Sequence, residues 1–269
     1  MKCAIHQPQF LPWLGYLHKI HNTDKFVFLD NVQFKKNEFQ NRNRLLVAGS
    51  ARWLTVPVSF HFGDTLLETR IAESVPWRKK ITHAINLNYA KTPYFQHFKE
   101  SLERVIEREY KNLAELNEAT ARWLMECFDI HTETYTSSQF PAYARAGLLP
   151  ARELSQDPVQ RLIDICRQVG ADTYLSGAGG HKYLEPLKFE KAGIKLEFQE
   201  FQHPVYPQHH GSQLTVNSSQ FTVHSSQSTE DKQFTEEGAG FVSCLSAIDG
   251  LFNCGGGAAG RKMLNIEIQ

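Results

Sequence analysis

A short apolar strand that leads through a loop into a helix opens the chain, and this order constrains the fold more than any other feature. Lys2 to Gln7 has the composition of a buried strand. Pro8, Pro12 and Gly15 interrupt regular structure after it. A helix is predicted near residues 13–22. Strand, loop and helix together form the first half of an α/β unit.

The same alternation returns later in the chain. Phe26 to Leu29 predicts a second strand that ends at Asp30, which places this carboxylate at the strand's carboxyl edge, where ligands of open α/β sheets bind. Asp157-Pro158 begins a helix that ends near Gly170, with the aspartate as its cap. Further strands are predicted at 173–175 and 194–201. We therefore expect an α/β fold with a mixed sheet and flanking helices.

A helical middle segment and a small antiparallel patch interrupt this alternation. A hairpin is predicted from 45–48 and 53–58 around the turn Gly49 to Ala51, with a possible third strand at 66–71. Three helices are predicted at 78–90, 94–109 and 113–128 because their apolar residues recur every three to four positions. A last amphipathic helix is predicted at 241–252, ended by Asn253 and a glycine run.

Length and composition predict one domain over residues 1–269. The chain has 269 residues, of which 41% are hydrophobic, and this is enough for one core without disulfides. Residues 212–238 differ because they are rich in Ser, Gln and Thr and contain a near repeat of seven residues. Such a tract buries too little apolar surface to offset its ordering entropy, so a disordered low-complexity insertion is expected there.

Charge and cysteine usage exclude several classes of partner and several cellular locations. Lysines plus arginines equal aspartates plus glutamates at 29 each, so the chain lacks the positive field that nucleic-acid binding needs. The beginning lacks a secretion signal, and no apolar run is long enough for a membrane span. Five scattered cysteines fit reduced thiols, so a cytoplasmic protein is expected. The oligomeric state stays open.

The densest group of chemical side chains lies between His6 and Lys19, at the predicted strand-to-helix junction. His6 can act as an acid or base near neutral pH, and Lys19 offers a positive end for an anionic group. The amide of Gln7 and the rings of Trp13 and Tyr16 complete a pocket-like set. The alternative is a helix start in which both rings merely pack.

Two polar stretches follow this segment. Asp30 is a candidate catalytic residue because of its place at a strand end. Asn41, Arg42 and Asn43 are candidate substrate contacts, since a guanidinium group can hold a phosphate in bidentate fashion. A solvated loop whose charges have no function is the competing interpretation.

Later candidates lie in two loops. Ser176, Gly177, Gly179 and Gly180 form a small-residue loop whose backbone N–H groups can face a phosphate or an oxyanion, although the loop matches no established phosphate-binding motif. His203 can face the same cleft as His6, although a histidine before a proline is often structural. No histidine and cysteine spacing typical of a metal site occurs, so no required metal is predicted.

Seven groups of motif residues, apart from 212–238, span nearly the whole chain in this order: His6 to Tyr16, Asn41 to Asn43, Trp53 to Pro57, Tyr174 to Gly177, Tyr183-Leu184, His203 to Tyr206, and Leu245 to Asp249 with Leu251 to Asn253. Together they resemble the WbqC-like family of polysaccharide-biosynthesis proteins. Tyr183 and Tyr206 join the substrate-binding candidates through these motifs.

The resemblance implies a role in O-antigen or other surface-polysaccharide synthesis, in which a nucleotide-linked amino sugar receives an acyl or glycyl group. From side-chain chemistry we expect His6 as general base with Asp30 assisting, Arg42 and Lys19 as phosphate contacts, and the 176–180 backbone as an oxyanion site. No resident cofactor is expected, although an activated acyl donor or ATP is possible. An ATP-dependent ligase or nucleotidyltransferase and a non-catalytic module that binds sugar nucleotides or a partner remain alternatives.

Overall fold

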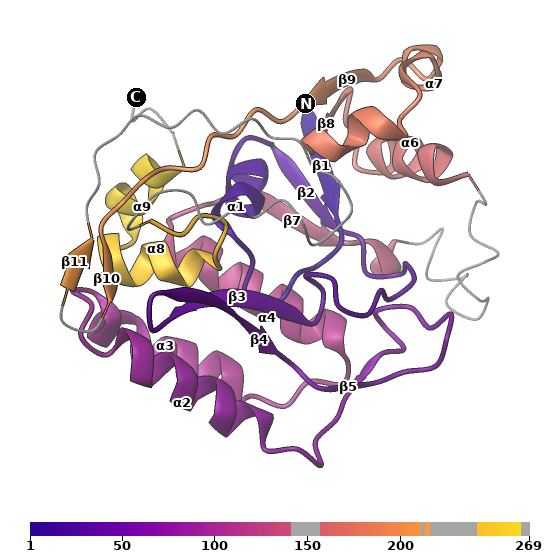
Figure 1. Cartoon of the computed structure of the whole chain (residues 1–269). Helices are drawn as coiled ribbons and strands as arrows, with labels where there is room; N and C mark the ends of the chain where they lie inside the picture. The colour runs from indigo at the N-terminus through magenta and orange to yellow at the C-terminus, as the bar shows by residue number, and fades with distance from the viewer. Residues whose placement is uncertain (141–156, 211–212, 216–240, 265–269) are drawn as a thin grey trace.

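A parallel sheet of five strands forms the centre of the protein (Figure 1). The computed structural model describes residues 1–140, 157–210, 213–215 and 241–264. The strand order is β7-β2-β1-β8-β9. The strands span Glu133–Thr136 (β7), Lys25–Phe28 (β2), Lys2–His6 (β1), Thr173–Ser176 (β8) and Lys195–Phe198 (β9). All four pairings are parallel, so every strand ends at the same edge.

The order of the strands reverses at β1. From β1 the chain proceeds outward through β2 to β7, and it then returns to the other side of β1 to add β8 and β9. The loops after β1 and β8 therefore leave the sheet in opposite directions. In open α/β sheets ligands bind at this point, so a ligand site is expected at the carboxyl ends of these two strands.

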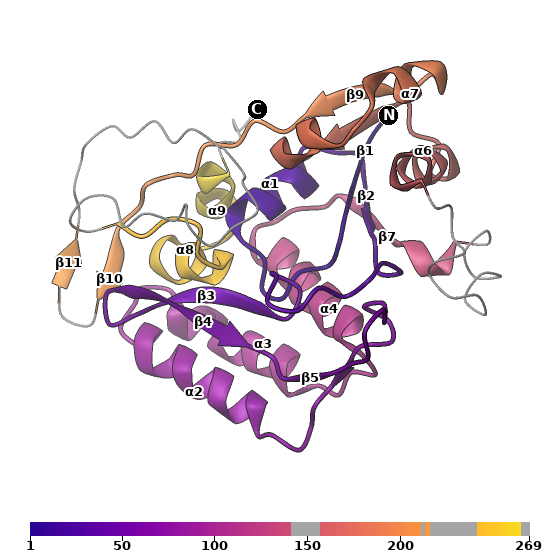
Figure 2. The same cartoon turned by 45° about the vertical axis from the view of Figure 1, so that its right-hand side comes forward.

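Alternating side chains divide the core between the two faces of the sheet. Ala4, Phe26 and Phe28 face one hydrophobic cluster, which includes residues of α1 (Leu14–His21) and α4 (Leu113–Cys127). Their neighbours Cys3, Ile5 and Val27 face a second cluster with α6 (Pro158–Gln168) and α7 (Pro186–Lys191). Figures 1 and 2 show these two pairs of helices on opposite sides of the sheet. The predicted α/β class with flanking helices is confirmed.

The helical middle and the antiparallel hairpin are also present. Strands β3 (Arg42–Val47) and β4 (Ser50–Thr55) form the hairpin, which is a separate two-stranded sheet. Helices α2 (Trp77–Tyr89) and α3 (Phe95–Glu107) precede α4. The possible third strand does not join the hairpin, because β6 (Arg70–Ile71) pairs with β5 (Val58–Ser59) instead.

The end of the described chain differs from the prediction of one helix at 241–252. Ser246 caps α8 (Ala247–Cys254) by accepting a hydrogen bond from the Ile248 N–H, so the helix begins later than its apolar residues indicate. Gly255 then takes a positive φ of 89°, and α9 (Gly257–Met263) follows. The glycine run thus joins two helices.

Most of the predicted insertion at 212–238 lies outside the described residues. Within it, β11 (Gln213–Thr215) pairs antiparallel with β10 (Gln208–His210). Two short elements in the described chain complete the fold, the 3₁₀ helices η1 (Ser137–Gln139) and η4 (Ala178–Lys182). No helix in the described part of the chain is both long and apolar enough to cross a membrane.

A buried carboxylate fastens the C-terminal helices to the rest of the fold. Asp249 on α8 is fully buried, and it accepts hydrogen bonds from the Tyr89 hydroxyl at 2.9 Å and the Tyr206 hydroxyl at 2.8 Å. The Gln208 amide donates a third at 2.9 Å. These donors come from α2, from the segment before β10 and from β10 itself, so one side chain on α8 connects distant parts of the chain.

Removing one of these donors is expected to destabilise the protein. Tyr206→Phe leaves a buried carboxylate with one donor fewer, and the free energy of unfolding should fall by about 1–3 kcal/mol. Urea denaturation measures the change. Tyr135→Phe is the matched control, because the Tyr135 hydroxyl bonds to the exposed Glu133, and its change should stay within about 0.5 kcal/mol. Equal changes in both variants would contradict the role of Asp249.

Candidate functional site

The candidate site lies where β1 and β8 end, at the reversal of strand order (Figure 1). His6 is the last residue of β1, and Ser176 is the last of β8. Helix α1 follows the loop after β1 and brings Lys19 to the loop after β8. Three of the residues predicted from sequence are thus brought to one edge by parallel pairing.

His6 is a half-buried histidine with an unused ring nitrogen. Its Nδ1 atom is buried and has no hydrogen-bond partner. The ring packs against Tyr16 with centroids 4.9 Å apart. Burial, and then the charge of Lys19, hold the pKa of His6 well below its usual 6.5. The imidazole is therefore neutral at physiological pH and can accept a proton or a hydrogen bond from a ligand.

Lys19 is a buried lysine whose ammonium makes no hydrogen bond or ion pair with the described residues. Its side chain lies beside Gly177, where an added Cβ would stand 3.0 Å from Nζ. The residue is 5% exposed, and burial lowers the pKa of its amine to about 8. An unpaired buried charge is costly, so this cation is available to a ligand that brings a complementary group.

The loop after β8 packs closely because it contains glycine. The Ser176 hydroxyl donates to the Gly177 carbonyl at 3.1 Å, and a Cβ on Gly180 would come within 2.1 Å of the Ser176 oxygen. The Gly180 N–H bonds to the Gly177 carbonyl, so it is used within the loop. Gly179 lies in η4, and Tyr183 directly after η4 is 58% exposed.

Asp30 lies beyond β2 at the same edge, but its oxygens already have partners. The carboxylate accepts hydrogen bonds from the Ser137 hydroxyl at 2.7 Å, the Ser138 N–H at 2.9 Å and the Ser138 hydroxyl at 2.5 Å. It is 1% exposed. Asp30 thus joins the loop after β2 to the loop after β7 and shapes the edge of the sheet.

The remaining residues of the first motif support the loop between β1 and α1. Gln7 accepts a hydrogen bond from the Gln40 amide at 2.5 Å through its side chain and from the Tyr16 hydroxyl at 3.2 Å through its backbone. Trp13 is the residue before α1, and its ring meets Phe201 edge-on. Its ring also covers Gly15, where a Cβ would lie 2.3 Å away.

Asn41, Arg42 and Asn43 belong to the hairpin and its approach. Asn43 donates to the carbonyls of Phe10 and Leu11 at 3.2 and 2.7 Å and so fixes the loop that precedes α1. Asn41 donates to the Val56 carbonyl at 3.1 Å. Arg42 stacks on the Trp53 ring and donates to the Asn37 carbonyl. All three have local partners.

His203 and Tyr206 form an aromatic group with Phe201 and Phe241. Phe201 also contacts Trp13 and His18, so this group reaches α1. Burial lowers the pKa of His203 to about 4, and its Nε2 is buried without a partner. Tyr206 is committed to Asp249, as described above.

Glu118 on α4 is a candidate that the sequence analysis does not include. Its carboxylate accepts hydrogen bonds from the Thr136 hydroxyl at 2.7 Å, at the end of β7, and from Arg122 at 3.5 Å. Burial, with a further contribution from the charge of Asp30, raises the pKa of Glu118 to about 7. The negative charge of Glu118 also helps to raise the pKa of Tyr16, which touches His6. Glu118 lies within an amphipathic helix, and no sequence motif marks it as a functional residue.

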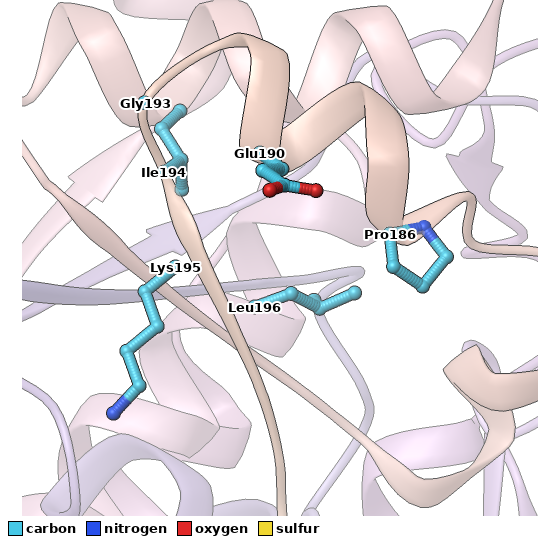
Figure 3. Close-up of a pocket in the computed structure, with 6 residues that line it drawn as sticks. All are labelled: Pro186, Glu190, Gly193, Ile194, Lys195 and Leu196. Atoms are coloured by element: carbon cyan, nitrogen blue, oxygen red, sulfur yellow. The ribbon is translucent and has the colours of Figure 1, made fainter.

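A surface hollow of about 400 Å³ lies elsewhere (Figure 3). It is formed by Pro186 and Glu190 of α7 and by residues 193–196. One of its two charged side chains, Lys195, is already paired with Glu197 at 2.7 Å. The hollow is open and lies beside the edge strand β9. Within the described residues, no group of three His, Cys, Asp or Glu side chains is arranged to hold a metal ion.

Comparison with known proteins agrees with the motifs. The sequence profile described as the WbqC-like protein family matches residues 7–219. The chain belongs to the WbqC-like family. The match begins at Gln7, one residue after His6, and therefore includes Lys19. It ends before the motif at 245–253.

A relative of this WbqC-like protein occurs in mycobacteria. The uncharacterized protein Rv1507c of Mycobacterium tuberculosis is 27% identical over 203 residues, which cover 74% of this chain and 82% of that protein. No solved structure matches the chain. The family thus rests on the profile match, and the site's chemistry must be argued from its residues.

The raised pKa of Glu118 predicts a pH-dependent stability. The folded protein keeps this proton up to about pH 7, whereas the unfolded chain loses it near the ordinary value of 4.5. Stability from this group is fully present below pH 4.5 and is lost as pH rises through 7. Glu118→Gln should remove that loss, so its free energy of unfolding relative to wild type should rise between pH 4.5 and 8 by on the order of 1–3 kcal/mol.

Denaturation at several pH values measures this difference. Glu126→Gln, an exposed change on the same helix, serves as the control and should run parallel to wild type. A Glu118→Gln profile that is also parallel to wild type would show that the carboxyl is not held protonated.

Proposed function

We propose that this WbqC-like protein is a cytoplasmic enzyme of polysaccharide biosynthesis that acylates an amino sugar. The substrate is a nucleotide-linked amino sugar, and the product carries an amide formed from an activated acyl or glycyl group. The reaction needs no resident cofactor in this proposal, because the activated donor supplies the driving force.

One observation carries the proposal. His6 presents a neutral imidazole with an unpartnered Nδ1 at the carboxyl end of β1, where the strand order reverses. An amine that attacks an acyl carbon must lose a proton as the new C–N bond forms and the bond to the leaving group breaks. A neutral imidazole is a suitable acceptor for that proton.

The neighbours of His6 support binding of an anionic substrate. Lys19 is mostly protonated at neutral pH, since burial lowers its pKa only to about 8. Its unpaired ammonium can contact a phosphate of the sugar nucleotide. Backbone N–H groups of the adjacent loop at Ser176 to Gly179 can stabilise the negative oxygen that forms during acyl transfer. Asp30, whose oxygens are occupied, holds the loops of this edge in place.

Ligand-induced stabilisation tests this proposal. Purified protein is heated with a nucleotide-linked amino sugar, the same nucleotide sugar without an amine, ATP, or acyl donors. A ligand at 100 times its Kd stabilises the native state by about 2.7 kcal/mol. We expect the amino-sugar nucleotide to raise Tm in wild type and in His83→Ala, an exposed histidine on α2, and to raise it less in His6→Ala.

Turnover then separates binding from catalysis. With a donor present, His6→Ala should slow amide formation by about 10²–10⁴-fold in single-turnover experiments. Stabilisation by ATP alone would favour the ligase, and stabilisation without any turnover would favour the binding module. An unchanged rate in His6→Ala would remove His6 as the base.

A further inference from the structure

Several other lysines of the described chain have amines with partners, and Lys19 differs from them in this respect. Lys25 donates to the Val169 carbonyl at 3.0 Å, Lys2 pairs with Glu197 at 2.8 Å, and Lys188 pairs with Asp157 at 2.7 Å. Lys19 is more deeply buried than these, at 5% exposure, and makes no such contact with any described residue. A structural lysine at this depth would be expected to have a carboxylate or carbonyl beside it.

The surroundings of Lys19 combine small and uncharged groups. Its amine lies against Gly177, the first residue after β8, where the absence of a Cβ leaves the nitrogen uncovered on that side. The charge of Lys19 helps to lower the pKa of His6, and the Nδ1 atom of His6 is buried without a partner. The site thus holds a largely buried amine and a neutral proton acceptor together.

We propose that Lys19 is a nucleophilic amine that forms an imine with the carbonyl group of a small aldehyde or ketone. Buried lysines without a charged partner are suited to this chemistry because a larger fraction of the amine is neutral. Burial lowers the pKa of Lys19 to about 8 from 10.5, so at pH 7 the neutral fraction rises by roughly two orders of magnitude.

The step balances with the groups present. The lone pair of neutral Nζ attacks the carbonyl carbon, the N–C bond forms, and the C=O π electrons move to oxygen. Nδ1 of His6 accepts one proton from the nitrogen and passes it to this oxygen, which becomes a hydroxyl group. The C–O bond then breaks as the nitrogen lone pair forms the C=N bond, and the second proton of the nitrogen joins the departing hydroxyl group, so amine and carbonyl yield imine and one water.

This inference does not depend on the proposed acyl transfer. Imine formation needs neither an acyl donor nor a sugar nucleotide, so failure of either proposal leaves the other open to its own test. In substrate-bound protein the same amine would be held charged by a phosphate, whereas in free protein it is available to a carbonyl.

Reductive trapping tests the proposal directly. Folded full-length protein at pH 7 is treated with glyceraldehyde and cyanoborohydride, which reduces an imine to a stable secondary amine. Peptide mapping by mass spectrometry then gives the rate of adduct formation at each lysine. We expect Lys19 to be labelled at least about tenfold faster than Lys25, the partnered lysine on the neighbouring strand β2.

Variants identify the cause of the difference. Lys19→Arg should abolish the fast adduct, Lys25→Arg should leave it unchanged, and His6→Ala should slow it, with circular dichroism confirming that each variant is folded. If Lys19→Arg does not fold, the peptide map of wild type still decides. Labelling of Lys19 at or below the rate of Lys25, or only after unfolding in urea, would overturn the proposal.

Discussion

The parallel pairing of β1 with β2 on one side and β8 on the other is the constraint on which the rest of the structure depends. It brings His6 and Ser176, 170 positions apart in the chain, to the same edge and sends the loops that follow them in opposite directions. Helix α1 packs on one face of the sheet and directs Lys19 across to the loop after β8. Small residues in that loop let the lysine approach the backbone.

Polar groups gather at this edge at a cost in stability that the two apolar clusters must offset. An unpaired lysine, a histidine with an unused nitrogen and a glutamate with a pKa of about 7 all lie within or next to the core. Each disfavours folding when charged. As a rule, buried polar groups in folded proteins have partners, and Asp30 and Asp249 follow it. Local departures from this rule are typical of functional sites, where perturbed groups serve chemistry.

Much of the fold was predictable from sequence because apolar runs and helical periodicity are local signals. They indicate β1, β2, β8 and the helices α1 to α4, and Asp157 marks the start of α6. They miss β7, because Glu133 to Thr136 is a short polar edge strand. They extend the last helix too far, because Phe241 and Val242 pack on the core without being helical. Pairing order is not a local signal either. His6 and Lys19 were expected together because they lie in one short segment, whereas the roles of Asp30, Asn43 and Glu118 emerge only from contacts.

The central claim is that the Lys19 amine is buried and unpaired at the reversal of strand order. The most direct measurement is an NMR titration of protein labelled with ¹³C at the lysine ε-carbons, in which Lys19→Arg assigns the resonance. The account predicts a pKa near 8 for Lys19. A pKa at or above the ordinary value of 10.5 would show that the amine is solvated or paired with a carboxylate, and it would contradict the account.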